Sequence, residues 1–151
     1  MLLRPLLLSA ALFAGLAPLT APPMKMGLWE NTSTVDMSGA NIPPAMQHQT
    51  MKLHQCITPE TWAKAFQHNA DHNCQFTNQS QSGGHFTVDI TCTAGTGHVD
   101  MNFSSPESGH GTVDMHMTHG SFNLSMTSTV EMHYLGSSCG SVTPEKPEIL
   151  R

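Results

Sequence analysis

The feature that most constrains the fold of this chain is the alternation of apolar and polar residues through most of its second half. The segment 85–93 shows it first, and its inward-facing residues are Phe86, Val88, Ile90 and Cys92. The same period of two recurs in the segments 98–103, 112–118 and 121–134. Strands with one buried face alternate in this way, whereas strands of a buried parallel sheet are apolar on both faces. The sequence therefore predicts an antiparallel sheet with one face in the core and the other in solvent.

Turn-forming residues separate these strands where hairpins require them. The predicted turns lie at 83–84, 95–97, 105–111 and 119–120, and each contains glycine. Two further strands are predicted earlier in the chain, at 26–36 and 49–56. Because strands joined by hairpins lie next to each other, we expect a mainly β fold with about six or seven strands in a curved, half-barrel-like antiparallel meander.

One short helix is predicted before the alternating segments. Thr58 suits the N-cap, Pro59 the first helical position and Glu60 the first turn. Trp62, Ala65 and Phe66 share one face of such a helix, because side chains three and four positions apart are neighbours. We expect this apolar face to lie across the inner face or the open end of the sheet.

The predicted turns also set a register for the last three long strands. Across the turn at 105–111, Val99 lies opposite Met115, and across the turn at 119–120, Met115 lies opposite Leu124. Every apolar residue stays on the core face in this register, which makes it internally consistent.

The first residues of the chain differ from the rest. Arg4 is followed by a run from Leu6 to Leu16 that contains only Leu, Ala, Phe, Gly and Ser, and Pro18 ends the apolar stretch. This pattern is typical of a secretory signal peptide and too short for a membrane span. The predicted division is a signal peptide at 1–21, a single β-rich domain at 22–141 and a flexible C-terminal tail at 142–151. We therefore expect an exported protein, periplasmic or secreted, with no stable membrane anchor.

The expected exported part contains four cysteines, Cys56, Cys74, Cys92 and Cys139. None of them forms a C-x-x-C pair, which disfavours a zinc ribbon and a thioredoxin-type redox site. Two disulfides are expected, because small exported domains use them as covalent staples. Pairing Cys74 with Cys92 and Cys56 with Cys139 is favoured, since setting Gln81 opposite His85 brings Cys74 directly across from Cys92. A pairing of Cys56 with Cys74 around the helix stays open.

Charge and motifs exclude several classes of function. The formal net charge is -5 and the chain has no basic run, which excludes sequence-independent binding to the phosphates of a nucleic acid. There is no G-x-S-x-G, no H-E-x-x-H and no phosphate-binding glycine loop before a helix. With no catalytic constellation in the sequence, we expect a protein that is not an enzyme.

Histidine is unusually frequent, with 10 residues. The predicted register sets His98 opposite His116 and Asp100 opposite Asp114 on the outer face. Opposed side chains have Cβ atoms roughly 5 Å apart, so the two aspartates repel unless a cation lies between them. His98, Asp100, Asp114 and His116 therefore form a candidate site for zinc or copper(II). Two hydrated aspartates on an open surface, or a register shifted by one step, would leave no site.

The 11 methionines favour a different interpretation. Their inward-facing members on the predicted strands are Met101, Met115, Met117, Met126 and Met132. Flexible methionine side chains fill irregular gaps in a core, and ligation of copper by thioethers is the alternative. A concave sheet with a Met-lined interior can hold a small apolar ligand or a segment of an envelope protein. We therefore expect a binding or envelope-associated module, and the alternative is a periplasmic copper- or zinc-binding protein that uses His, Asp and Met.

Several short motifs occur in a characteristic order along the chain. They are Gly27–Glu30 (GLWE), Gln55–Glu60 (QCITPE), Asn73-Cys74, 82–84, 89–92, 95–97 and the closing Cys139. In these motifs the chain resembles a bacterial family of exported small proteins known as domain-of-unknown-function family 3617. The resemblance covers nearly all of the expected mature chain. It implies an extracytoplasmic, mostly β domain with paired cysteines and no assigned activity, and it designates no catalytic residue.

Overall fold

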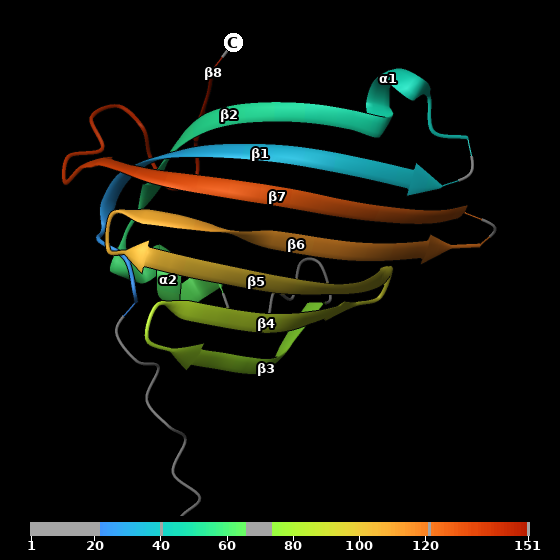
Figure 1. Cartoon of the computed structure of the whole chain (residues 1–151), viewed down its shortest axis with the longest axis horizontal. Coiled ribbons are helices and arrows are strands. Elements are labelled where there is room, and N and C mark those ends of the chain that lie inside the picture. The colour runs from blue at the N-terminus through green and yellow to red at the C-terminus, as the bar shows by residue number, and fades with distance from the viewer. Residues whose placement is uncertain (1–21, 40, 66–73, 121, 151) are drawn as a thin grey trace, which may run out of the picture.

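Eight strands form one open antiparallel sheet in the computed structural model, which describes residues 22–39, 41–65, 74–120 and 122–150. The strands are β1 (Gly27–Gly39), β2 (His48–Ile57), β3 (Cys74–Ser82), β4 (His85–Cys92), β5 (Gly95–Ser105), β6 (Ser108–His119), β7 (Phe122–Gly136) and β8 (Glu148–Leu150). Figure 1 shows them side by side in one curved layer. The predicted fold class is confirmed, although the sheet has eight strands rather than about six or seven. The predicted signal peptide at 1–21 lies outside the described residues.

The strand order combines a meander with an added N-terminal hairpin. Strands β3 to β7 follow one another in sequence and in space, as the glycine-containing turns predict. Strand β1 then pairs with β7 along most of its length, and β2 turns back to lie outside β1. The first described strand is therefore an interior strand of the sheet, and its side chains contribute to the middle of the core.

The inner face of the sheet carries the core. Trp29, Phe86 and Val88 are the largest fully buried side chains among the described residues. Met101 and Met132, two of the methionines predicted to point inward, are buried with Trp29 in one cluster. The period of two along these strands places their polar neighbours on the opposite, outer face.

Two glycines on the inner face of β6 leave room for large side chains of β5. A Cβ at Gly111 would lie 2.5 Å from the Met101 sulfur, and a Cβ at Gly109 would lie 2.7 Å from the Phe103 ring. Both glycines sit directly opposite the side chain that covers them, in the pairs Met101 with Gly111 and Phe103 with Gly109. Alternating large and small residues across the hairpin lets the inner face pack closely.

Two short helices accompany the sheet in the described part of the chain, α1 (Pro44–Gln47) and α2 (Pro59–Ala65). The predicted start of α2 is confirmed, because the Thr61 backbone N–H donates to Thr58 Oγ1 at 3.2 Å and the Thr58 N–H donates to Thr61 Oγ1 at 2.9 Å. This reciprocal cap satisfies two donors that a helix start leaves unpaired. The helix lies on the inner side of the sheet, where the Trp62 ring packs against Phe86 with centroids 5.6 Å apart. Phe66, predicted on the same helix face, lies outside the described residues.

Two disulfides join Cys56 to Cys139 and Cys74 to Cys92, the pairing that the sequence favours. Cys74 lies directly opposite Cys92 in the register of β3 and β4. The predicted pairing of Gln81 with His85 is wrong, because a bulge between Thr77 and Ser80 moves the register by one residue and sets Ser82 against His85.

The end of the chain differs from the predicted flexible tail at 142–151. Glu148–Leu150 forms β8, which pairs with the middle of β2. Val142 is also buried, at 7% exposure. The Cys56–Cys139 disulfide holds the chain beside the end of β2, so the segment that follows can return along that edge of the sheet.

The register of the last three long strands differs from the prediction by two residues at each hairpin. Val99 lies opposite Val113 rather than Met115, and Met115 lies opposite Met126 rather than Leu124. The first hairpin turns more tightly than expected, because Ser105 already pairs with Ser108. A shift of two residues preserves the face of every side chain, so the predicted core face is correct although its cross-strand partners are wrong.

Candidate functional site

A cavity of about 240 Å³ lies between the inner face of the sheet and α2. Its lining comes from six strands, the helix and the segment before β1, and consists of Met24, Asn31, Gln55, Ile57, Trp62, Phe86, Val99, Met101, Phe103, Val113, Val130 and Met132. The side chains from the strands all belong to the inner face. Because apolar groups dominate this lining, the cavity suits a small apolar ligand better than an ion.

Asn31 supplies the polar part of this cavity together with Gln55. The Asn31 side-chain amide donates from Nδ2 to Gln55 Oε1 at 2.8 Å. Asn31 is only 8% exposed, and its Oδ1 is buried without a hydrogen-bond partner among the described residues. Buried polar atoms are nearly always paired in native proteins, so this oxygen marks a place where a partner is expected.

The cavity is positioned by the same elements that form the core. Asn31 follows Trp29 by two residues on β1, and Trp29 is completely buried against Tyr134, with ring centroids 5.5 Å apart. Trp29 Nε1 also donates to the Lys25 carbonyl at 2.9 Å. These contacts fix the beginning of β1, and with it the position of Asn31.

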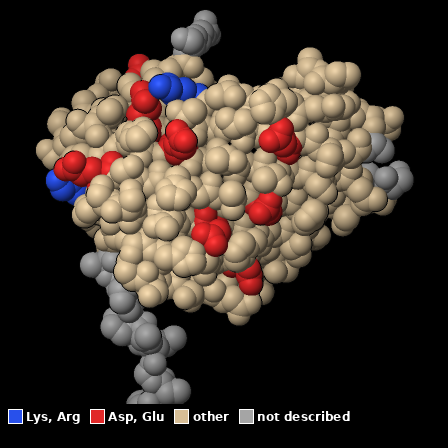
Figure 2. Space-filling model, viewed as in Figure 1, with Lys and Arg blue, Asp and Glu red and all other residues tan. Residues whose placement is uncertain are grey.

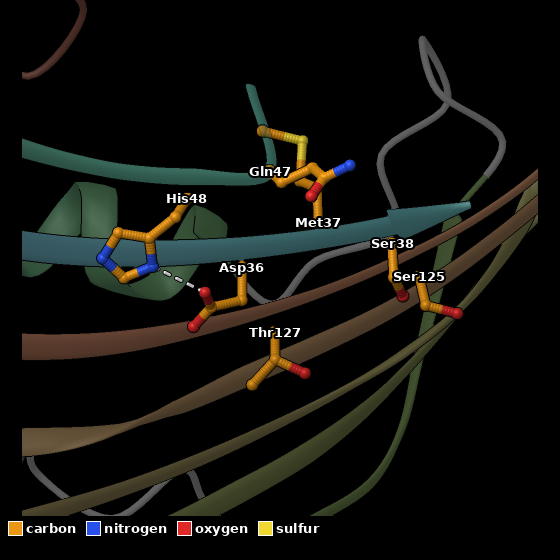
Figure 3. Close-up of a pocket in the computed structure, with 7 residues that line it drawn as sticks. All are labelled: Asp36, Met37, Ser38, Gln47, His48, Ser125 and Thr127. Atoms are coloured by element: carbon orange, nitrogen blue, oxygen red, sulfur yellow. Dashed lines mark hydrogen bonds and ion pairs between the residues drawn. The ribbon is translucent and has the colours of Figure 1, made fainter. Parts of the chain in front are cut away.

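A second depression, of about 380 Å³, lies at the end of the sheet beside α1. Figure 3 shows its lining, in which the His48 ring faces the Asp36 carboxylate across β1 and β2. His48 Nδ1 and Asp36 Oδ1 are 2.6 Å apart, but both side chains are about two-thirds exposed, at 67% and 65%. Water screens such a pair, so the exposed ion pair gives this larger depression little power to hold a ligand.

The predicted metal ligands do not come together as the sequence suggested. His98 lies opposite Asp114 on β6 and opposite Asp89 on β4, not opposite His116. Its Nδ1 donates to Asp89 Oδ1 at 2.6 Å. Asp100 lies opposite Thr112 rather than Asp114. The cause is the tighter turn between β5 and β6.

Each of these four side chains has its own hydrogen-bond partner. The Asp100 carboxylate accepts from His85 Nε2 at 2.9 Å, and the Asp114 carboxylate accepts from Thr127 Oγ1 at 2.7 Å. His116 Nδ1 forms a hydrogen bond with Ser125 Oγ at 2.9 Å. No group of three or more His, Cys, Asp or Glu side chains that could hold a metal ion occurs in the described part of the chain. The geometry therefore gives no support to the predicted zinc or copper(II) site.

The outer face is nevertheless chemically distinctive. Its carboxylates are Glu30, Asp36, Asp89, Asp100, Asp114, Glu131 and Glu148, and its histidines are His48, His54, His85, His98, His110, His116 and His133. In Figure 1 α2 lies behind the sheet, so Figure 2 looks onto this face and shows acidic residues across it, with basic residues only near its margin. Several of these histidines and carboxylates form cross-strand pairs on the solvent-exposed face of the sheet.

Hydrogen bonds lower the pKa of two of these carboxylates. The Asn78 amide, which donates to Asp89 Oδ2 at 2.7 Å, and the His98 ring lower the pKa of Asp89 below its usual value. The Lys52 ammonium, which donates to Glu30 Oε1 at 3.0 Å, lowers the pKa of Glu30. Both shifts favour the charged carboxylate, as expected for surface ion pairs and charge-assisted hydrogen bonds.

Sequence reasoning missed the polar residues of the cavity. Asn31 has the same parity as Trp29 and Val35 in the predicted strand at 26–36, which places it on the inner face. The sequence therefore assigned Asn31 a face, but neither a partner nor a cavity. Its partner Gln55 could be assigned only once the pairing of β1 with β2 was known.

Comparison with protein families finds that the family described as "Protein of unknown function (DUF3617)" matches residues 24–139. No curated protein and no solved structure matches the chain. Among the described residues, no helix is long and apolar enough to cross a membrane.

Proposed function

We propose that this chain, which belongs to the DUF3617 family of proteins of unknown function, is an exported, non-enzymatic binding module for a small apolar molecule. The ligand would lie between the inner face of the sheet and α2. The observation that carries the proposal is the cavity of about 240 Å³ with its almost entirely apolar lining. Such concave apolar sites with a few polar groups are the usual form of small-molecule binding sites.

The volume of the cavity and the absence of charge among its described lining residues restrict the size and the charge of the ligand. Its volume of about 240 Å³ lies below the range of about 300–1,000 Å³ that is common for drug-sized ligands, so a single ring or a short chain fits. None of the described lining residues is charged at neutral pH. A charged ligand would lose its hydration without gaining a partner, so the ligand is expected to be neutral.

Export to an oxidising compartment best accounts for the two disulfides. The two disulfides leave no free cysteine among the described residues, and disulfides persist mainly in oxidising compartments. The signal-peptide pattern at 1–21 supports the same proposal. The proposed location of the mature chain is therefore periplasmic or secreted.

The direct test is to titrate the purified, disulfide-bonded protein with toluene and to monitor the methyl resonances by NMR. We expect the resonances of Ile57, Val99 and Val130 to move, because these side chains line the cavity. The variant Val113→Phe fills the cavity and should abolish the shifts. The matched control Val35→Phe changes a partly buried inner-face residue outside the cavity lining and should keep them.

Two results would overturn the proposed function. The first is that no neutral aromatic probe of the size of toluene, toluene included, moves the cavity resonances up to its solubility limit. The second is that Val35→Phe weakens binding as much as Val113→Phe, because the response would then follow general loss of packing rather than occupation of the cavity.

A further inference from the structure

The side-chain oxygen of Asn31 is a buried hydrogen-bond acceptor at the wall of an otherwise apolar cavity. Asn31 is 8% exposed and lines the cavity, and its Oδ1 has no partner among the described residues. Folding has therefore removed this oxygen from water without replacing the lost hydrogen bond. Native proteins rarely keep such an atom unless a ligand, an ion or a bound water completes it.

The neighbouring Gln55 determines which end of the Asn31 amide is free. Gln55 Oε1 can only accept a hydrogen bond, and it takes one from Asn31 Nδ2 at 2.8 Å. The two residues come from neighbouring strands, β1 and β2. This contact uses the donor end of the Asn31 amide and leaves the acceptor end, Oδ1, for another group.

We infer that the ligand of the cavity is a neutral small alcohol or phenol, whose hydroxyl group donates a hydrogen bond to Asn31 Oδ1. This inference rests on the proposed function and narrows its ligand class. A carboxylic acid or an amine would bring a charge among side chains that cannot pair with it. An aliphatic or aromatic hydrocarbon would fill the same space and leave the Asn31 oxygen unpaired.

The expected selectivity follows from this difference between ligands that can donate a hydrogen bond to Asn31 Oδ1 and ligands that cannot. A site built around a hydrogen bond discriminates against an analogue that lacks the bonding group, because the buried partner is then left unsatisfied. Apolar contacts alone discriminate poorly between molecules of similar shape. The hydroxyl group, rather than the ring, should therefore decide which molecules of suitable size bind most tightly.

Three aromatic probes of similar size separate these contributions. Phenol donates a hydrogen bond, anisole only accepts one, and toluene does neither. In NMR titrations of the disulfide-bonded protein we expect phenol to bind about tenfold more tightly than toluene, as a net gain from one buried hydrogen bond implies. Anisole should bind no more tightly than toluene.

The variant Asn31→Leu tests the assigned residue. It keeps the size of the side chain and removes the oxygen, so phenol and toluene should bind to it with similar affinity. The control Asn102→Leu changes an exposed asparagine on the outer face of β5 and should retain the preference for phenol. Should Asn31→Leu fail to fold, the Asn31 side-chain carbonyl carbon of the unaltered protein gives a second readout, because phenol should shift its resonance and toluene should not.

The outcomes distinguish this inference from the proposed function. If toluene, anisole and phenol bind equally, the hydrogen bond to Asn31 is refuted while the binding module stands. If anisole binds more tightly than phenol, the free group is a donor and the inference is wrong. If none of the three enters the cavity, the proposed function fails, and the assignment of the ligand class fails with it.

Discussion

Removing the two disulfides one at a time should destabilise the protein by different amounts. Cys56–Cys139 closes a loop with a sequence separation of 83, whereas Cys74–Cys92 closes one of 18. If a disulfide acts mainly by restricting the unfolded chain, the loss is about 4.6 kcal/mol for the longer loop and about 3.2 kcal/mol for the shorter one. The double variant Cys56→Ala with Cys139→Ala should therefore be the less stable by about 1.4 kcal/mol.

Urea denaturation followed by tryptophan fluorescence measures this difference, because Trp29 is completely buried in the folded state. With a slope of about 1–3 kcal/mol per molar urea, the two midpoints should differ by roughly 0.5–1.4 M. The reasoning is refuted if the variant lacking Cys74–Cys92 unfolds at the same urea concentration as the other variant, or at a lower one. Loop length would then not be the property that decides the contribution of each disulfide.

Three further substitutions test separate parts of the structure. Gly111→Ala places a Cβ 2.1 Å from the Asp100 carbonyl oxygen, and the resulting overpacking should cost about 1–3 kcal/mol in urea unfolding; an unchanged midpoint would contradict the close approach. Phe86→Ala removes a ring that is 2% exposed and should cost about 3–5 kcal/mol, seen as a lower melting temperature. Asp89 has a lowered pKa in the folded state, so the unfolded state binds more protons and stability falls as the pH drops through the carboxylate range. The gap in urea midpoint between the unaltered protein and Asp89→Asn should therefore be constant at neutral pH and narrow below about pH 4; a gap that does not change with pH would exclude the charge as its cause.

The sequence predicted the elements and their faces well because both depend on local patterns. The apolar residues at every second position from Phe86 onward required one buried face, and the structure buries Phe86 and Val88 there. The start of α2 was predictable for the same reason, since Thr58 and Pro59 act within a single turn of the chain. Such signals do not depend on what lies across the sheet.

The register was not predictable because it depends on the geometry of each turn. A shift of two residues leaves all side chains on their faces, so the hydrophobic pattern cannot detect it. The pairing of Ser105 with Ser108 made the hairpin tighter than the glycines at 109 and 111 suggested. Those glycines instead serve packing, because they leave space for Phe103 and Met101. The predicted metal site depended on His98 facing His116 and was lost with this change of register.

The same dependence explains why the cavity emerged only from the structure. Its polar pair joins β1 to β2, and its walls add Val99, Val113 and Trp62 from elements far apart in the sequence. In the sequence Asn31 looks like any polar residue of a strand, since alternation alone assigns it a face and not a neighbour. It becomes notable only because Gln55 occupies its donor end while its buried acceptor end has no partner among the described residues. Under the proposed function, a ligand that donates a hydrogen bond to the Asn31 oxygen would offset the cost of burying it, and this argument favours binding over packing as the role of Asn31.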